Sequence, residues 1–85
     1  MEELKQILTS AGIFASEFAQ LVKVHRLTAT RWVNGHPIRQ ELQRHAVIKM
    51  AELIRSGTEK GVFPISKEFT YAERMPEIRR RLRSL

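Results

Sequence analysis

The sequence predicts an all-α fold, a compact bundle of four helices followed by a short C-terminal helical arm. Two observations lead to this prediction. Apolar residues recur at intervals of three and four along most of the chain, which is the spacing of one face of an α-helix. Gly and Pro fall between these stretches, where a helix has to end. A hydrophobic fraction of 42% in 85 residues is enough for one small core.

Three short helices are predicted in the N-terminal part of the chain. The first ends at Gly12, which suits a left-handed C-cap. The second covers about residues 15–22, and a tight turn at Lys23-Val24 leads into a third over about residues 25–34. The apolar stripes that the first two helices should bury are Leu4, Ile7, Leu8 and Ala11, and then Ala15, Phe18, Ala19 and Val22.

A fourth helix is predicted from about residue 38 to residue 55, with Ser56-Gly57 ending it. Ile48 is the exception to its amphipathic pattern, because it points into the polar face. The residues expected to share the broad apolar face are Leu42, Ala46, Val47, Met50, Leu53 and Ile54.

Residues 58–85 are predicted to form a connector and a basic arm, next to a domain of residues 1–57. Pro76 suits the first turn of a last helix. Two interpretations of this arm stay open. Its arginines could lie along phosphates, or its apolar residues could pack on the core or on a second subunit, which the regular spacing favours. The arginines are Arg79, Arg80, Arg81 and Arg83, and the apolar residues are Phe69, Tyr71, Ile78, Leu82 and Leu85.

The charge of the chain favours a polyanionic partner. Fifteen Lys and Arg residues against nine Asp and Glu give a net charge of +6. The surplus grows along the chain, from +1 in residues 1–38 to +2 in residues 39–61 and +3 in residues 62–85. The chain has no cysteine, no apolar run long enough for a membrane span and an acidic N-terminus unlike a secretory signal. We therefore expect a soluble cytoplasmic protein without membrane contact.

No catalytic or metal-binding pattern is visible. The histidines His25, His36 and His45 are too far apart to stack on one helical turn, and no cysteine joins them. The sequence contains no nucleophile elbow, no Walker loop and no glycine-rich dinucleotide turn. We expect a protein that is not an enzyme and that binds no cofactor or metal.

The third predicted helix has one face suited to reading DNA. At about 100° per residue, five of its side chains fall within an arc of about 140°. They are Arg26, Leu27, Thr30, Arg31 and Asn34. Arg can donate two parallel hydrogen bonds to guanine, and Leu can contact a thymine methyl group. Thr30 can reach a base or a phosphate, while Ala29 and Trp32 on the opposite side can be buried.

Residues 18–35 resemble the helix-turn-helix of Cro/C1-type phage and bacterial repressors. The resemblance rests on two short helices around a tight turn and on the ending Arg31-Trp32-Val33-Asn34-Gly35, and it covers roughly residues 3–56. It implies a lambda-repressor-like fold whose second motif helix enters the major groove. It also implies base-reading positions for Arg26, Leu27 and Arg31, and backbone contacts for His25, Thr28, Asn34, His36 and Arg39. We add Thr30 to the base-reading residues because it shares their helical face, and Lys23 to the expected backbone contacts.

Three positions depart from the pattern of this family. Lys23 stands where Gly is usual in the turn, although a left-handed residue with a Cβ costs about 1 kcal/mol. His25 stands where a Ser or Thr N-cap is common, and we expect it to cap poorly. Ala15 stands where a phosphate-binding Gln is frequent, so that contact is expected to be missing.

Two functions are compatible with these observations. The first is a transcriptional regulator, most like a phage or prophage repressor, which binds double-stranded DNA as a homodimer at an inverted repeat. The second is a protein-binding module, such as an antitoxin or an anti-regulator, whose contact surface is residues 62–85.

Overall fold

The computed structural model describes residues 3–85, and over this range it contains five α-helices and no strand. The predicted all-helical fold is confirmed. The helices are α1 (Leu4–Ala11), α2 (Ala15–Val22), α3 (Arg26–Val33), α4 (Glu41–Glu59) and α5 (Tyr71–Arg83).

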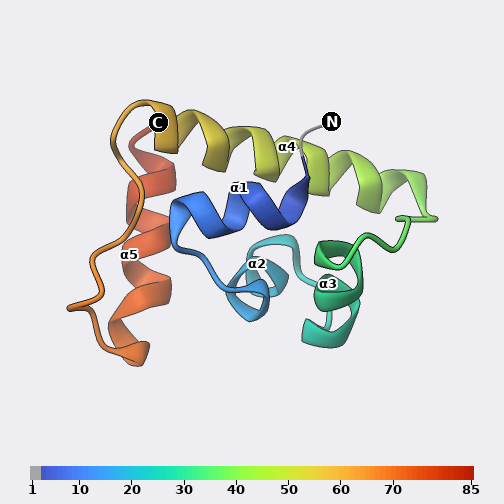
Figure 1. The fold of residues 1–85 in the computed structure, drawn as a ribbon, viewed down its shortest axis with the longest axis horizontal. Coiled ribbons are helices and arrows are strands. Elements are labelled where there is room, and N and C mark those ends of the chain that lie inside the picture. The colour runs from blue at the N-terminus through green and yellow to red at the C-terminus, as the bar shows by residue number, and fades with distance from the viewer. Residues whose placement is uncertain (1–2) are drawn as a thin grey trace.

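The long helix α4 forms one side of the molecule, and the shorter helices lie against it (Figure 1). Helix α1 packs along α4, and α2 packs on both α3 and α4. Helix α5 contacts α4 and lies at one end of the molecule, whereas α3 lies at the other end (Figure 1). The order of the helices in space therefore places α2 between the C-terminal helix and α3.

The helices share one hydrophobic core. The side chains of Phe18, Ile54 and Ile78 are completely buried in it. Phe63, Ile65 and Ile78 bring the C-terminal segment into the same cluster as residues of α1, α2 and α4. Phe69 and Leu82 pack against this cluster as well. The predicted packing of the arm on the core is thus observed, except that Tyr71 is 78% exposed and does not take part.

The two predicted turn positions have the left-handed backbone that the sequence indicated. Gly12 ends α1 with φ of 66°. Lys23 ends α2 with φ of 59° and ψ of 48°, and the Val24 N–H donates to the Ala19 carbonyl. Lys23 is the one non-glycine residue with positive φ in the described chain. A residue with a Cβ therefore occupies the left-handed position of the α2–α3 turn.

The predicted start and the predicted end of α4 were both wrong. The helix begins at Glu41 rather than at residue 38, and it continues through Gly57 to Glu59. Gly57 is buried because the Phe63 ring lies against it, and a Cβ there would stand 2.7 Å from Phe63 Cδ2. This glycine allows a close packing contact inside the helix, and it does not end the helix.

The predicted apolar face of α4 is only partly buried. Val47, Ala51 and Ile54 belong to the core, but Leu42 is 87% exposed and Ala46 is exposed too. The N-terminal turns of α4 extend beyond α1 (Figure 1), and Leu42 and Ala46 line an open hollow toward Val22 and Trp32 instead of packing in the core. Ile48, which was expected on the polar face, is half-buried.

The prediction that Pro76 lies in the first turn of the last helix was also wrong. Helix α5 begins one and a half turns earlier, and Pro76 lies inside it. Thr70 and Glu73 form a capping box, in which the Thr70 N–H donates to Glu73 Oε1 at 2.8 Å. Among residues 3–85, no helix combines the length and the apolar character that a membrane span needs.

Candidate nucleic-acid interface

Helix α3 is held by its packing on α2. Ala29 is completely buried and Trp32 is 9% exposed, as predicted for the inner face of α3. On α2, Phe18 and Ala19 are buried. Because Ala29 has only a methyl group, the two helices can approach closely while the indole of Trp32 fills the space beside it. The opposite face of α3 is left in contact with solvent.

The outer face of α3 presents the four residues predicted to read bases. Arg26, Thr30 and Arg31 are exposed, and Leu27 is 59% exposed. Neither guanidinium group forms a hydrogen bond or ion pair with any residue from 3 to 85. Both retain all five N–H donors for an external acceptor.

Thr30 is less free than the arginines. Its hydroxyl donates to the Arg26 carbonyl at 2.8 Å, within the helix. In this arrangement the hydroxyl oxygen is left only as an acceptor. It therefore suits an amino group on a base edge, such as that of cytosine or adenine, better than a phosphate, which also only accepts.

The N-cap of α3 differs from the prediction. His25 Nδ1 accepts a hydrogen bond from the Leu27 N–H at 3.1 Å, so the imidazole caps the helix although a poor cap was predicted. Since Nδ1 is the acceptor, the ring proton lies on Nε2, which remains available to donate to a phosphate. Lys23 is exposed on one side of His25, whereas Thr28 is half-buried.

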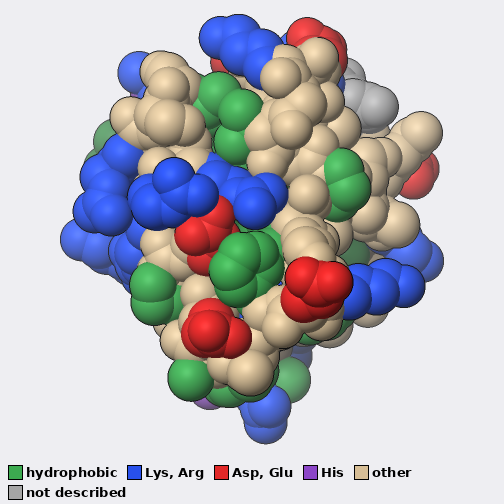
Figure 2. Space-filling model, turned by 90° about the vertical axis from the view of Figure 1, so that its left-hand side faces the viewer, with side chains coloured by type: hydrophobic (Ala, Val, Ile, Leu, Met, Phe, Trp, Pro, Cys, Tyr) green, Lys and Arg blue, Asp and Glu red, His purple; other side chains and the backbone are tan. Residues whose placement is uncertain are grey.

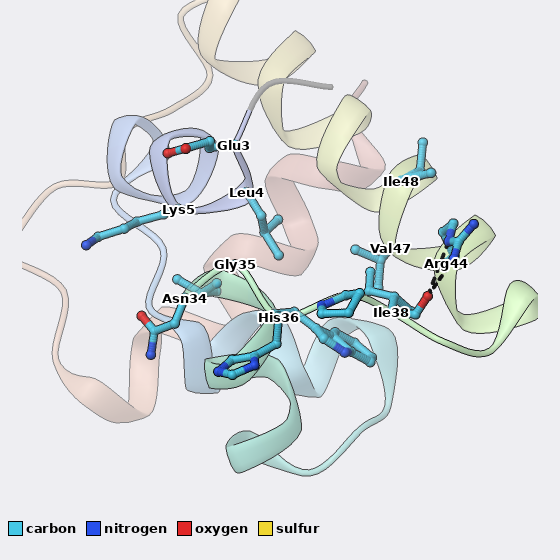
Figure 3. Close-up of a pocket in the computed structure, with 13 residues that line it drawn as sticks. Glu3, Leu4, Lys5, Asn34, Gly35, His36, Ile38, Arg44, Val47 and Ile48 are labelled. Carbon is cyan, nitrogen blue, oxygen red and sulfur yellow. Dashed lines mark hydrogen bonds between the residues drawn. The ribbon is translucent and has the colours of Figure 1, made fainter.

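The segment after α3 is exposed, with its end attached to α4. Asn34, His36 and Arg39 are exposed, and Figure 3 shows the Asn34 and His36 side chains pointing away from α4. Arg44 donates to the Ile38 carbonyl at 2.8 Å through Nη2 and at 3.3 Å through Nε (Figure 3). Arg44 thus holds the end of this loop against α4.

An open hollow of about 690 Å³ lies between this loop, the start of α1 and α4 (Figure 3). Its lining is mainly apolar toward the core, where Leu4, Val47 and Ile48 contribute side chains. Among the described residues, no group of three or more His, Asp or Glu side chains is placed to hold a metal ion.

The segment that contains α3 carries a surplus of positive charge. Residues 18–40 contain four Lys and Arg residues and no Asp or Glu. The nearest acid on the N-terminal side, Glu17, is 2% exposed and forms an ion pair with Arg74. This part of the surface therefore attracts anions at long range, and the four cations that produce the field are Lys23, Arg26, Arg31 and Arg39.

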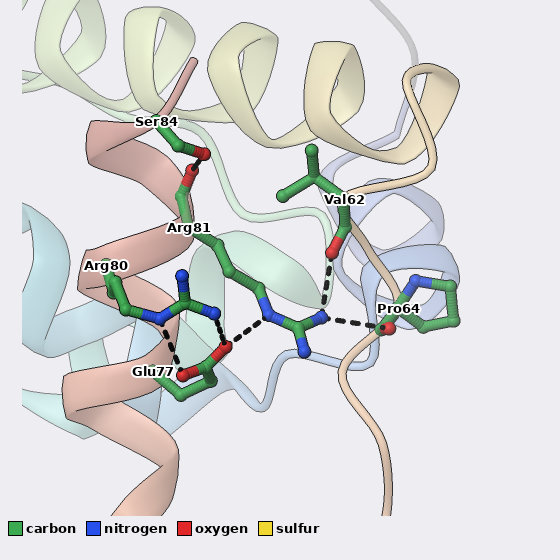
Figure 4. A network of polar contacts seen from close by, with 6 residues as sticks. All are labelled: Val62, Pro64, Glu77, Arg80, Arg81 and Ser84. Carbon is green, nitrogen blue, oxygen red and sulfur yellow. Dashed lines mark hydrogen bonds and ion pairs between the residues drawn. The ribbon is translucent and has the colours of Figure 1, made fainter.

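Two arginines of α5, Arg80 and Arg81, have a common partner on the same helix (Figure 4). Arg80 Nε donates to Glu77 Oε1 at 2.9 Å, and Arg81 Nε donates to Glu77 Oε2 at 2.6 Å. Arg80, and then Arg81, lower the pKa of Glu77 to about 2. Figure 2 shows the same pattern, with Lys and Arg side chains directly beside Asp and Glu side chains on this face. Arg79 and Arg83 have no such contact with residues 3–85.

Comparisons with family models, with curated proteins and with solved structures find no match. The resemblance to Cro/C1-type regulators therefore depends on the residues of α2, α3 and the turn between them.

Proposed function

We propose that this protein is a sequence-specific DNA-binding transcriptional regulator with a lambda-repressor-like arrangement of its first four helices. Helix α3 lies in the major groove, and its outer face contacts base edges. One observation above all supports this. Arg26 and Arg31 are exposed on the same face of a helix whose other face is buried, and neither has a partner among residues 3–85. Unpaired guanidinium groups on a rigid element suit bidentate recognition of guanine.

The residues around α3 suit contacts with the sugar-phosphate backbone. Lys23, His25, Asn34, His36 and Arg39 are exposed on either side of the reading face. Thr28, being half-buried, would contribute only through its exposed part. Such contacts set the position of the protein on the duplex but carry no sequence information.

The regulator acts as a homodimer on an inverted repeat. An eight-residue reading helix reaches few base pairs, and a second copy doubles the contacts and the specificity. The protein represses by occupying a site that RNA polymerase needs.

A protein-binding module that uses residues 62–85 is the rival function. Its support is Tyr71, an aromatic side chain that is 78% exposed on α5. Exposed aromatic residues are enriched at protein interfaces.

The deciding experiment selects bound fragments from random double-stranded DNA and then measures affinity for the enriched sequence. We expect the R26A/R31A variant to bind this sequence about a hundredfold more weakly, since each bidentate contact contributes about 1–3 kcal/mol. The matched control is R79A/R83A, which removes the same charge from α5 and should keep the sequence preference. The logarithm of affinity should fall with the logarithm of salt by about 0.9 per phosphate neutralised.

Selection without any enriched sequence would refute the proposal, as would an R26A/R31A variant that binds like the wild type. A protein complex that survives R26A/R31A but is lost on replacing Tyr71 with Ala would favour the rival function.

A further inference from the structure

Arg74 is the one buried cation among residues 3–85, and it connects α5 to the start of α2. The residue is 8% exposed. Its Nε donates to Glu17 Oε2 at 2.7 Å, and its Nη2 donates to Glu17 Oε1 at 3.0 Å and to the Gly12 carbonyl at 2.5 Å. The guanidinium also lies over the ring of Phe14, 4.5 Å from its centroid.

All three partners of Arg74 determine where α2 begins. Gly12 ends α1, Phe14 is the N-cap of α2, and Glu17 is the third residue of that helix. Glu17 Oε1 accepts a second hydrogen bond, from the Phe14 N–H at 2.9 Å. One guanidinium therefore holds the turn before α2, its N-cap and the carboxylate that completes its cap.

The position of α2 in turn decides that of α3. The eight residues of α2 make about two turns and pack more extensively on α3 than on any other helix. Helix α5 and helix α3 lie at opposite ends of the molecule (Figure 1). The Arg74 contact therefore gives α5 a route to the reading face through α2.

The Arg74 contact orients the start of α2 more than it attaches α5 to the core. Ile78 already anchors α5 in the core with its completely buried side chain. A buried ion pair often stabilises no more than an apolar pair of similar size, because both charges lose their hydration. What the guanidinium adds is direction, since its planar fork satisfies several acceptors only in one geometry.

We propose that Arg74 is a positioning residue, through which α5 sets the start of α2 and thereby the orientation of α3 on DNA. Helix α5 is then part of the DNA-reading unit although it does not touch DNA. This inference rests on the proposed function.

The test uses two variants of the full chain. Removing Arg74 alone would leave a buried, unpaired carboxylate, which is strongly destabilising. We therefore choose the double variant E17Q/R74M, in which the Gln oxygen can still accept from the Phe14 N–H. The conservative variant R74K keeps a charge beside Glu17 but lacks the planar fork. The control is R79M, which removes from the same helix an exposed arginine that has no partner among residues 3–85.

We expect E17Q/R74M to keep the helical content of the wild type but to bind the selected DNA about tenfold more weakly. A displaced α3 would lose the geometry that its bidentate contacts with base edges need. R74K should show part of this loss, and R79M none. The slope of affinity against salt should stay unchanged, since no phosphate contact is removed. Amide resonances should shift not only around residues 12–17 but also in α3.

Wild-type affinity and unshifted α3 resonances in folded R74K or E17Q/R74M would overturn the inference. A salt slope reduced by about 0.9 would also overturn it, because Arg74 would then contact a phosphate directly. Failure of the wild type to select any DNA sequence refutes the proposed function instead, while the α3 resonances still test the coupling between α5 and α3.

Discussion

The arginines of α3 and those of α5 have different surroundings, although both helices are basic. Arg26 and Arg31 are exposed and have no partner among residues 3–85. Arg80 and Arg81 bind Glu77, which precedes them by three and four residues on the same helix. Side chains at these spacings are neighbours on a helix surface, whereas residues 18–40 offer no acid at any spacing.

This difference shows that the total charge of a segment is a poor guide to its binding surface. Residues 62–85 carry the largest positive surplus, +3, yet several of their arginines are already used inside the protein. The first 38 residues carry a surplus of only +1, but Arg26 and Arg31 have no partner among residues 3–85. The positions of the acids decide which cations can meet an external anion.

Among the variants that test this comparison, Arg81→Ala should have the largest effect on the free energy of unfolding. Arg81 donates to Glu77 and to the Val62 carbonyl at 2.8 Å, and it lies 5.8 Å from the Phe69 ring centroid. Losing these contacts should lower the free energy of unfolding by about 1–3 kcal/mol. Urea denaturation followed by circular dichroism measures it.

Arg83→Ala is the matched control for this measurement, since Arg83 is exposed and has no partner among the described residues. Arg26→Ala should change the unfolding free energy by less than about 0.5 kcal/mol, as is usual at the surface. Equal stability losses for Arg26→Ala and Arg81→Ala would remove the distinction between the two helices.

The first three helices could be predicted because their signals are local. Gly12 and the stripe of α1 lie within a few residues of each other, and so do Ala29 and Trp32, which set the inner face of α3. The predicted exposure of Arg26 and Arg31 follows from the same short-range periodicity.

The parts that were missed depend on contacts between different segments of the chain, with one exception. Gly57 lies inside α4 with the Phe63 ring packed on it, and Arg74 meets Glu17 across 57 positions. Helical periodicity holds no information about such contacts. The exception is the start of α5, because the capping box of Thr70 and Glu73 is a visible sequence signal that outweighs Pro76.

A smaller effect is expected from Lys23→Gly, which separates stability from binding. At φ of 59° the Cβ of Lys23 costs about 1 kcal/mol, so glycine should raise the free energy of unfolding by about that amount. The same change removes one cation beside α3, so the salt slope of DNA binding should shrink by about 0.9.

Lys60→Gly is the control for this variant, because Lys60 has φ of −85° and carries no such strain. It should lower stability slightly through the greater freedom of the unfolded chain. A Lys23→Gly protein that is less stable than the wild type would show that the turn between α2 and α3 is not strained.

The smallest effect is expected from lowering the pH. Acid should weaken the contacts of Glu77 in α5 without changing the charge of the segment around α3. Arg80 and Arg81 lower the pKa of Glu77 to about 2, from an ordinary value of 4.5. The folded state thus favours the carboxylate, and its contribution to stability is complete above pH 4.5 and is lost as the pH falls toward 2. The carboxyl carbon shift of Glu77 in an NMR titration reports the midpoint, and Glu77→Gln should lack this part of the pH dependence of unfolding.

Residues 18–40 contain no carboxylate side chain, so the Nε resonances of Arg26 and Arg31 should stay unchanged over this pH range while that of Arg80 moves. A Glu77 midpoint near 4.5 would mean that Arg80 and Arg81 are as free as Arg26 and Arg31, and the contrast between these two pairs would disappear.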